Sequence, residues 1–230
     1  MDYWQSRTAK IIGYNCLNKL KNSHILIAGL GGVGSWVAES LARSGVGQLT
    51  IIDFDTVDES NINRQMPALI TTVGCVKTRV VKERLLSINK DIIVNELALK
   101  LDKNNIEDIL KCQPDYVVDA IDLVSCKIAL IEKCVKLGIK VISSMGAGNR
   151  ILPAGFIVAD ISKTYNCPLA RTVRLRLRKD GIKKGVKTVF NTNLPLTNFY
   201  TAESAPGSMM FAPAVCGLTI AAEVVNDLIK

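Results

Sequence analysis

The stretch HILIAGLGGVG, residues 24–34, decides the fold of this 230-residue chain. Its first five residues are almost entirely apolar, as in a parallel strand that is buried on both faces. The run ends in the glycine pattern G-x-G-x-x-G, and residues 35–44 follow with apolar side chains at helical spacing. A strand, a glycine-rich turn and a helix in this order predict a site where backbone N–H groups bind the phosphates of a nucleotide.

The same alternation of strand and helix continues along the chain. Strand patterns lie at 49–52, 92–94, 116–118 and 141–142, and helical patterns lie at 77–88, 106–111 and 125–137. The alternation predicts an α/β fold with a Rossmann-like, doubly wound and mainly parallel sheet. The apolar stretch 211–229 predicts a long buried helix. We expect residues 1–150 to form the nucleotide-binding region and residues 151–230 to complete the same domain.

The positive charge is concentrated in one segment. Lys and Arg number 29 against 21 Asp and Glu, and residues 163–187 alone carry nine Lys or Arg and one Asp. Such a segment predicts contacts with nucleic-acid phosphates, although a solvated basic surface is the alternative. Its spacing fits either a strand with one basic face or a helix. The candidate side chains for contacts with nucleic acid are Arg171, Arg174, Arg176, Arg178 and Lys179.

Histidine and cysteine usage excludes several classes of site. His24 is the single histidine and opens a buried strand, so a multi-histidine metal site is excluded and catalysis by a Ser-His or Cys-His pair would require His24. The seven cysteines include no C-x-x-C pair, which excludes a zinc site built on such pairs and favours a reducing compartment. With neither a signal-peptide pattern nor an unbroken apolar run of about 18 residues, we expect a cytoplasmic protein without a membrane span.

The nucleotide site is expected at the ends of the first strands. Asp53 ends the second strand, where a carboxylate can accept hydrogen bonds from ribose hydroxyls. Residues 53–65, DFDTVDESNINRQ, are too polar for a dinucleotide dehydrogenase. Asn61, Arg64 and Lys77 supply donors and cations that suit a triphosphate. Asp119 and Asp122 close the strand at 116–118, where a carboxylate that faces a triphosphate is a natural Mg²⁺ ligand.

Four motifs together resemble the superfamily of ubiquitin-activating-type adenylating enzymes, which includes ThiF, MoeB and HesA. They are GLGGVGS at 29–35, DFDTVDESNINRQ at 53–65, VGCVK at 73–77 and DAID at 119–122. The resemblance covers nearly the whole chain. It implies an ATP pocket lined by Gly29, Gly31, Gly32, Gly34, Asp53, Asp55, Asn61, Arg64, Gln65 and Lys77.

The same resemblance implies the catalytic groups. Arg64 and Lys77 would steady the phosphates, Asp122 would bind Mg²⁺, and Arg7 would reach across a homodimer into the partner's ATP site. Asp119 is interpreted as a capping residue or a ligand, and Lys127 as a solvated helix residue. Alkali-metal binding is left open.

The downstream half is similar to the tRNA threonylcarbamoyladenosine dehydratase branch of this superfamily. The matching pieces are GAGNR at 146–150, ADI at 159–161 and PLAR at 168–171, whereas Cys167 stands where that branch is expected to have aspartate. The resemblance implies a tRNA carrying N6-threonylcarbamoyladenosine. ATP would activate its carboxylate as an adenylate, and the carbamoyl group would close a ring in a net dehydration.

Two alternatives remain. One is adenylation of the C-terminal glycine of a ubiquitin-like sulfur carrier, against which the missing C-x-x-C pairs argue. In that case Cys167 would be an exposed thiol in a polar loop, with Lys163 and Arg171 lowering its pKa. A sulfur-transfer or cysteine desulfurase system is left open as a partner for either activity. The other is a non-enzymatic nucleotide-binding module, against which Asn61, Arg64 and Lys77 argue.

Overall fold

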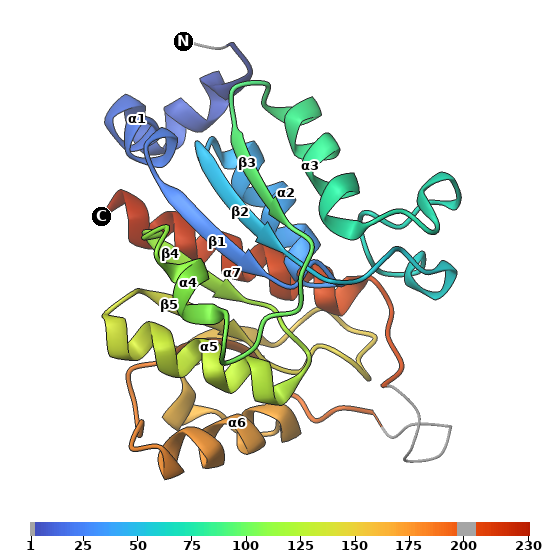
Figure 1. The fold of residues 1–230 in the computed structure, drawn as a ribbon, viewed down its shortest axis with the longest axis vertical. Helices are drawn as coiled ribbons and strands as arrows, with labels where there is room; N and C mark the ends of the chain where they lie inside the picture. Colours follow the sequence, from blue (N-terminus) through green and yellow to red (C-terminus); the bar gives the residue numbers. More distant parts are fainter. Residues whose placement is uncertain (1–2, 197–205) are drawn as a thin grey trace.

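A seven-stranded sheet forms the centre of the molecule in a computed structural model that describes residues 3–196 and 206–230 (Figure 1). The strands run in the order β3-β2-β1-β4-β5-β7-β6. All neighbours pair in parallel except β6 and β7, which are antiparallel. Their bounds are β1 His24–Ala28, β2 Gln48–Ile52, β3 Ile93–Leu97, β4 Tyr116–Asp119, β5 Val141–Ser144, β6 Phe156–Asp160 and β7 Lys187–Asn191.

Helices cover both faces of the sheet, as the doubly wound prediction requires (Figure 1). They are α1 Ser6–Lys21, α2 Gly34–Ser44, α3 Lys77–Ile88, α4 Ile106–Leu110, α5 Val124–Leu137, α6 Pro168–Lys179 and α7 Phe211–Ile229, with short 3-10 turns at Tyr3–Gln5, Glu59–Asn61, Ile70–Thr72 and Ile161–Lys163. The predicted fold class is confirmed.

The first strand shows why its sequence is apolar without alternation. Ile25 and Ile27 pack into one core layer with α2 and α7, whereas Leu26 and Ala28 pack into the other layer with α4 and α5. Because successive side chains of a strand point to opposite faces, a strand between two helical layers must be apolar at every position.

The direction in which the chain adds strands to the sheet reverses between β1 and β4. The chain moves from β1 outward to β2 and β3, and then returns to the other side of β1 as β4 and β5. Crossovers from neighbouring strands therefore leave in opposite directions beyond β1 and β4. In open α/β sheets this point of reversal is where ligands bind, beyond the carboxyl ends of the strands.

Residues 151–230 complete the same sheet. They contribute β6, β7 and α6, which the sequence patterns did not resolve, and α7, which they did. α7 packs closely on α2, because a methyl group on Gly217 would lie 2.6 Å from the carbonyl oxygen of Val33. The division near residue 150 stays a prediction.

α7 is also long and apolar enough to cross a membrane when only length and composition are considered. Its most apolar 18 residues have a mean hydropathy of 1.4, and 44% of them are buried inside the protein. The buried core helix of a globular protein meets the same criterion. Glu223 and Asp227 interrupt its apolar run, and the absence of a membrane span stays a prediction.

Candidate functional site

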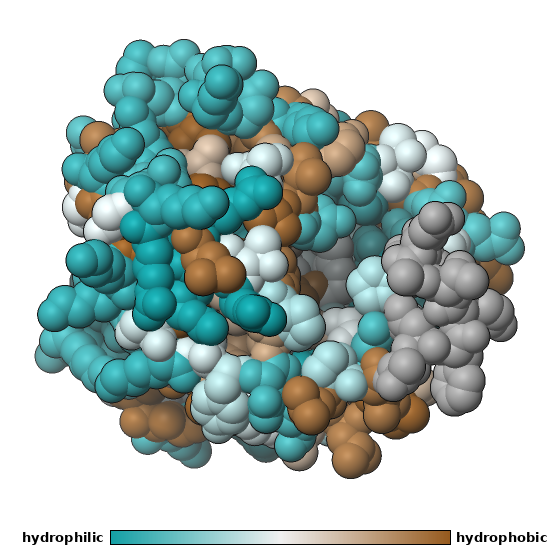
Figure 2. Space-filling model, turned by 90° about the horizontal axis from the view of Figure 1, so that it is seen from below, coloured by the Kyte–Doolittle hydropathy of each residue, from teal (hydrophilic) through white to brown (hydrophobic). Residues whose placement is uncertain are grey.

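A cavity of about 730 Å³ lies at the carboxyl ends of the strands, where their order reverses. The view from below shows a hollow in this surface of the molecule (Figure 2). One end of the cavity, the nucleotide end, is lined by Gly29, Gly31, Gly32, Asp53, Asp55, Arg64, Gln65, Lys77 and Asp122. The other end, the distal end, is lined by residues 144–150 at and beyond the end of β5, 167–169 at the start of α6, and residues 195, 206 and 208.

The four glycines of the turn serve two different purposes. Gly29 has φ +91°, and a methyl group there would lie 2.6 Å from the carbonyl oxygen of Ala120. A methyl group on Gly34 would lie 1.8 Å from the carbonyl oxygen of Gly29, so these two glycines let β1, α2 and the end of β4 approach one another. Gly31 and Gly32 line the cavity, and a methyl group on Gly31 would meet nothing closer than 3.9 Å. Gly34 does not line the cavity.

Asp53 fastens the glycine turn to the end of β2. Its Oδ2 accepts a 2.6 Å hydrogen bond from the N–H of Leu30, and its Oδ1 accepts one of 2.9 Å from the N–H of Asp55. The carboxylate lines the cavity and is buried. Each oxygen retains an acceptor site, so the residue can shape the turn and still receive a ribose hydroxyl.

The cationic groups of the nucleotide end are held by the protein itself. Lys77, at the start of α3, is 4% exposed and its Nζ lies 2.9 Å from Oδ2 of Asp55. Arg64 donates from Nη1 to the carbonyl oxygen of Ser60 at 2.7 Å and to Oδ1 of Asn63 at 2.8 Å. Both side chains reach the cavity with donors to spare.

Two amide side chains of the 53–65 stretch differ in their surroundings. Asn61 does not line the cavity, and its Oδ1 accepts a hydrogen bond from the N–H of Asp58 as part of a local cap. Gln65 does line it and is 8% exposed, and its Oε1 has no hydrogen-bond partner among the described residues. An unpartnered buried acceptor in a cavity wall fits a site that a ligand completes.

Asp122 is exposed in the cavity lining, on the same wall as Gly29. Asp55, the other carboxylate on the mouth of the nucleotide end, is already paired with Lys77. No group of three or more His, Cys, Asp or Glu side chains suited to a metal ion occurs within residues 3–196 and 206–230. One free carboxylate suits Mg²⁺ that takes most of its ligands from phosphate oxygens and water.

A buried ion pair lies beneath this wall. Lys127 and Asp119 are both 0% exposed, and Nζ of Lys127 lies 2.7 Å from Oδ2 of Asp119. The ammonium also donates to the hydroxyl of Ser143 at 3.3 Å and to the carbonyl oxygen of Ser144 at 3.0 Å. Asp119 further accepts a 3.1 Å hydrogen bond from the N–H of Ile121. We call these side chains the buried cluster.

The interpretation of Lys127 as a solvated helix residue is therefore wrong. Lysine at the fourth position of an amphipathic helix resembles a surface residue, and its charge partner lies eight residues earlier, on another element. The pairing appears only when β4, α5 and β5 are assembled. Asp119 caps the turn after β4 as one interpretation held, but it does not reach the cavity lining.

Cys167 lies at the distal end rather than in an exposed loop. It precedes α6, is 5% exposed and accepts a 3.4 Å hydrogen bond at Sγ from the N–H of Gly146. Its expected exposure is wrong because the turn-like sequence around it packs α6 onto the loop after β5. Cys167 does line the cavity.

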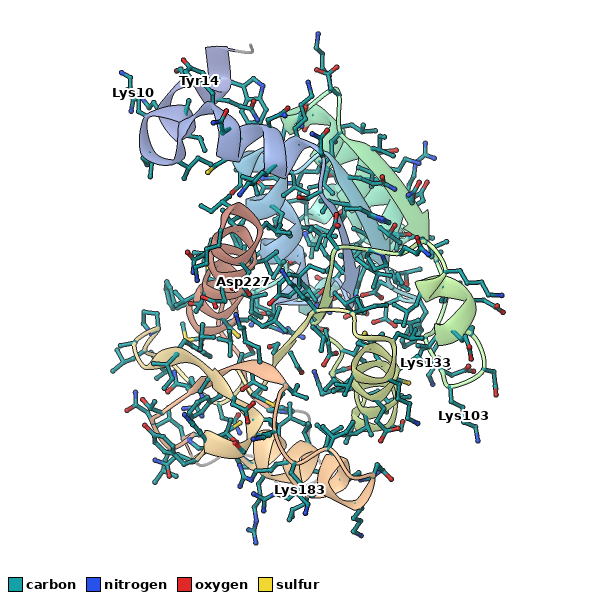
Figure 3. The ribbon with its side chains drawn as sticks, turned by 90° about the vertical axis from the view of Figure 1, so that its left-hand side faces the viewer. Lys10, Tyr14, Lys103, Lys133, Lys183 and Asp227 are labelled. Carbon is teal, nitrogen blue, oxygen red and sulfur yellow. The ribbon has the colours of Figure 1, made fainter. Side chains whose placement is uncertain are left out.

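Arg7 lies on α1, at the end of the molecule where the parallel strands begin and away from the cavity. The adjacent Gln5 touches the carboxyl end of α2, because a methyl group on Gly45 would lie 2.2 Å from Nε2 of Gln5. Figure 3 shows Lys10 and Tyr14 of α1 pointing outward at that end of the molecule. The exposed Arg7 therefore cannot reach the cavity of its own chain.

The central part of the basic segment, Pro168–Lys179, forms the helix α6. Of the two elements that its spacing allowed, a strand or a helix, the helix is confirmed. Arg171, Arg176, Arg178 and Lys179 are exposed on α6. Arg174 instead donates to the carbonyl oxygen of Thr164 at 2.9 Å and to the hydroxyl of that residue. Lys183, which follows α6, projects at the end of the molecule opposite α1 (Figure 3).

His24 is a structural residue away from the cavity. Its Nε2 lies 2.8 Å from the hydroxyl of Thr50, between β1 and β2. Burial lowers the pKa of its imidazole, and the nearby carboxylate of Asp115 only partly opposes this. The structure supports the interpretation that His24 takes no part in the chemistry.

Comparison with known proteins agrees with the motifs. The ThiF family profile matches residues 4–230. The tRNA threonylcarbamoyladenosine dehydratase of Bacillus subtilis (strain 168) is 42% identical over 98% of this chain and 94% of its own length. The crystal structure of E. coli tRNA N6-threonylcarbamoyladenosine dehydratase in complex with ATP matches with a TM-score of 0.92 at 35% identity, over 99% of this chain and 96% of that one.

A relative with a different description is matched over less of its own length. An adenylyltransferase and sulfurtransferase of Saccharomyces cerevisiae (strain YJM789) is 35% identical over 65% of this chain and 34% of its own. The profile match over nearly every residue and the 42% identical relative establish the assignment. The chain belongs to the ThiF family.

Proposed function

We propose that the chain is an ATP-dependent tRNA threonylcarbamoyladenosine dehydratase. The observation that carries the proposal is one cavity lined by Gly31 and Gly32 together with Arg64, Lys77 and Asp122. Glycine N–H groups and cations suit a triphosphate, and the carboxylate suits its metal ion. The distal end leaves room for a second substrate next to the nucleotide.

The reaction proceeds in two balanced steps. A carboxylate oxygen of the threonylcarbamoyl group attacks the α-phosphorus of ATP, and the bond from that phosphorus to the β-phosphate bridging oxygen breaks and releases pyrophosphate. The carbamoyl group then attacks the acyl carbon, loses a proton, and AMP leaves with the former carboxylate oxygen. The nucleophile belongs to the substrate in both steps, so the protein needs to bind, orient and neutralise charge.

Six residues of the nucleotide end have a task in this scheme. Gly31 and Gly32 let backbone N–H groups approach the phosphates, while Asp53 receives the ribose. Arg64 and Lys77 balance the negative charge that shifts to pyrophosphate as it leaves. Asp122 would hold Mg²⁺, which screens the charge of the phosphates when it is bound.

A homodimer completes the site in this proposal. Arg7 lies too far from its own cavity, so it would serve the cavity of a partner. The exposed basic side chains of α6 would contact the tRNA backbone and direct the modified nucleoside toward the distal end. We place the protein in the cytoplasm, where tRNA and ATP occur together.

The sulfur-carrier alternative has less support. It favours an accessible thiol, and Cys167 is buried at 5% exposure. The chain also has no C-x-x-C pair. A sulfur-transfer or cysteine desulfurase system remains a proposed partner only.

The decisive experiment incubates the purified protein with ATP, Mg²⁺ and tRNA that carries N6-threonylcarbamoyladenosine. Nucleoside mass spectrometry should show a loss of one water from the modified nucleoside, with one AMP formed for each dehydration. Pyrophosphate exchange that depends on a ubiquitin-like protein, together with unchanged tRNA, would contradict the proposal.

A further inference from the structure

Arg150 is the one charged side chain at the distal end of the cavity among the described residues. The rest of that lining is apolar or neutral, including Met145, Gly146 and Leu169. Arg150 is 7% exposed, so its guanidinium lies within the protein rather than at the rim. A charged group at this depth must be compensated by its surroundings or by a ligand.

Neutral acceptors hold Arg150 from one side only. Its Nη1 donates to Oδ1 of Asn191 at 3.2 Å and to the carbonyl oxygen of Asn193 at 2.7 Å. Asn191 is fixed in turn, because its amide donates to the carbonyl oxygen of Ala154 at 3.0 Å. Within residues 3–196 and 206–230, Nε has no partner and Nη2 makes no hydrogen bond. The orientation of the guanidinium is therefore fixed, and its Nε and Nη2 remain as hydrogen-bond donors.

No carboxylate of the described chain neutralises Arg150. It forms no ion pair there, in contrast to Lys127, whose charge meets Asp119. Burial lowers the pKa of the guanidinium, although a nearby Cys167 would oppose this, and arginine stays charged at any physiological pH. A fixed, buried and unpaired cation in a cavity wall is suited to an anionic ligand.

The position of Arg150 at the distal end of the cavity indicates which anion it binds. Phosphates have their own cations, Arg64 and Lys77, at the nucleotide end. On the basis of the proposed function, we propose that Arg150 binds the carboxylate of the threonylcarbamoyl group and holds it toward the α-phosphate. A planar guanidinium fork matches a planar carboxylate better than an ammonium does.

Arg150 would then act in both steps. One carboxylate oxygen stays on the guanidinium while the other attacks phosphorus and leaves later with AMP. The retained oxygen becomes the carbonyl oxygen of the acyl-adenylate, and negative charge develops on it when the carbamoyl group attacks the acyl carbon. A cation already placed there stabilises that charge without reorganisation.

The test compares binding of two tRNAs in the absence of ATP. They are identical except that one carries N6-threonylcarbamoyladenosine and the other plain adenosine at the same position. Wild-type protein should prefer the modified tRNA by about tenfold or more, because a hydrogen-bonded carboxylate is gained. Arg150→Gln should lose this preference, lower kcat/KM for dehydration about a hundredfold, and keep its affinity for ATP.

Two further variants make the result specific. Arg79→Gln removes a guanidinium from the exposed face of α3 and should behave as wild type. Arg150→Lys keeps the charge without the fork and should retain an intermediate preference. It also tests the inference if Arg150→Gln does not fold, as judged by circular dichroism.

Each outcome is distinguishable. An Arg150→Gln protein that keeps its preference and its turnover overturns the role of Arg150 alone. Equal loss of ATP affinity would assign Arg150 to the nucleotide and also overturn it. A wild-type protein that does not dehydrate the modified tRNA overturns the proposed function, and the inference with it.

Discussion

The buried cluster and Arg150 in the cavity wall treat charge in opposite ways. In the buried cluster, Lys127 finds a carboxylate, a hydroxyl and a carbonyl oxygen within hydrogen-bond distance. In the wall, Arg150 lacks an anionic partner among the described residues, and Gln65 keeps an unpartnered oxygen there. Charged groups that have a partner hold the carboxyl ends of β4 and β5 together, whereas buried polar groups without a partner are available to ligands.

The largest expected effect is on stability, in the buried cluster. Lys127→Met should lower the free energy of unfolding by about 3–5 kcal/mol, because Asp119 is left as a buried unpaired charge. Urea denaturation measures the loss. Lys133→Met on the same helix removes a partly exposed pair with Glu107 and should cost about 0–1 kcal/mol. Equal losses for the two variants would remove the contrast between cluster and surface.

The double variant Asp119→Asn, Lys127→Met sharpens this result. It removes both charges, so it should be more stable than Lys127→Met alone. If the two losses simply add, the ion pair does not couple these residues.

The next largest effect is on activity, at the nucleotide end. Arg64→Ala and Asp122→Ala should lower adenylation about a hundredfold or more, since Arg64 balances the charge of the departing pyrophosphate and Asp122 would hold the Mg²⁺ that screens it. The midpoint of thermal unfolding should hardly change, because neither side chain belongs to the core. Arg79→Ala is the matched control. Full turnover by either variant would show that the wall has been assigned incorrectly.

The glycine turn gives a smaller and more discriminating pair. Gly29→Ala forces a left-handed φ of +91° on alanine and a 2.6 Å approach to Ala120, and should cost at least about 1–3 kcal/mol of stability. Gly31→Ala should fold normally and bind ATP more weakly. Calorimetry of unfolding and of ATP binding separates the two, and the reverse pattern would contradict the division of the turn into packing and phosphate-facing glycines.

Substitutions of the exposed basic residues of α6 should change only the affinity for tRNA. Reversing Arg171, Arg176 and Arg178 to Glu should reduce the slope of log affinity against log salt by about one for each lost phosphate contact. The control variant reverses the exposed Lys90, Lys103 and Lys140, which changes the net charge by the same amount. ATP affinity should be unaltered in both. An equal reduction in both would indicate a general charge effect instead of a site.

The smallest effect concerns pH. Burial raises the pKa of Asp227, but hydrogen bonds from Lys187 and Tyr116 outweigh it and hold the pKa below its usual value. Asp227 therefore stabilises the fold fully above the pKa of an unfolded aspartate, and this contribution is lost as pH falls through the lower folded value. Asp227→Asn should weaken the decline of stability below about pH 4, measured by urea unfolding.

The strands β1, β2, β4 and β5 were predictable because each contains a short, mainly apolar run that does not alternate with charged residues. α6 was not, because its basic and amphipathic sequence fits either a helix or a strand. β6 and β7 were missed, although FIVA at 156–159 and TVF at 188–190 are also short runs with little charge. Arg174 illustrates the limit. Its sequence spacing matches that of Arg176 and Arg178, but in the folded chain it donates to Thr164 and so fastens α6 to the preceding turn.

The cavity wall was largely predictable from local motifs, because Gly31, Asp53, Arg64 and Lys77 lie in or beside the first turns of the fold. The buried cluster and the distal end were not. Lys127 and Arg150 acquire their meaning from partners on other strands, and Cys167 from the helix that covers it.

By itself, the sequence determined the fold class, the nucleotide end of the cavity and the ThiF family, because these rest on short-range patterns of apolar residues, glycines and charges. Only the tertiary structure decided which charges are compensated. Compensation is a contact between segments far apart in the chain, as between Asp119 and Lys127 or between Arg150 and Asn191, and sequence spacing does not report it.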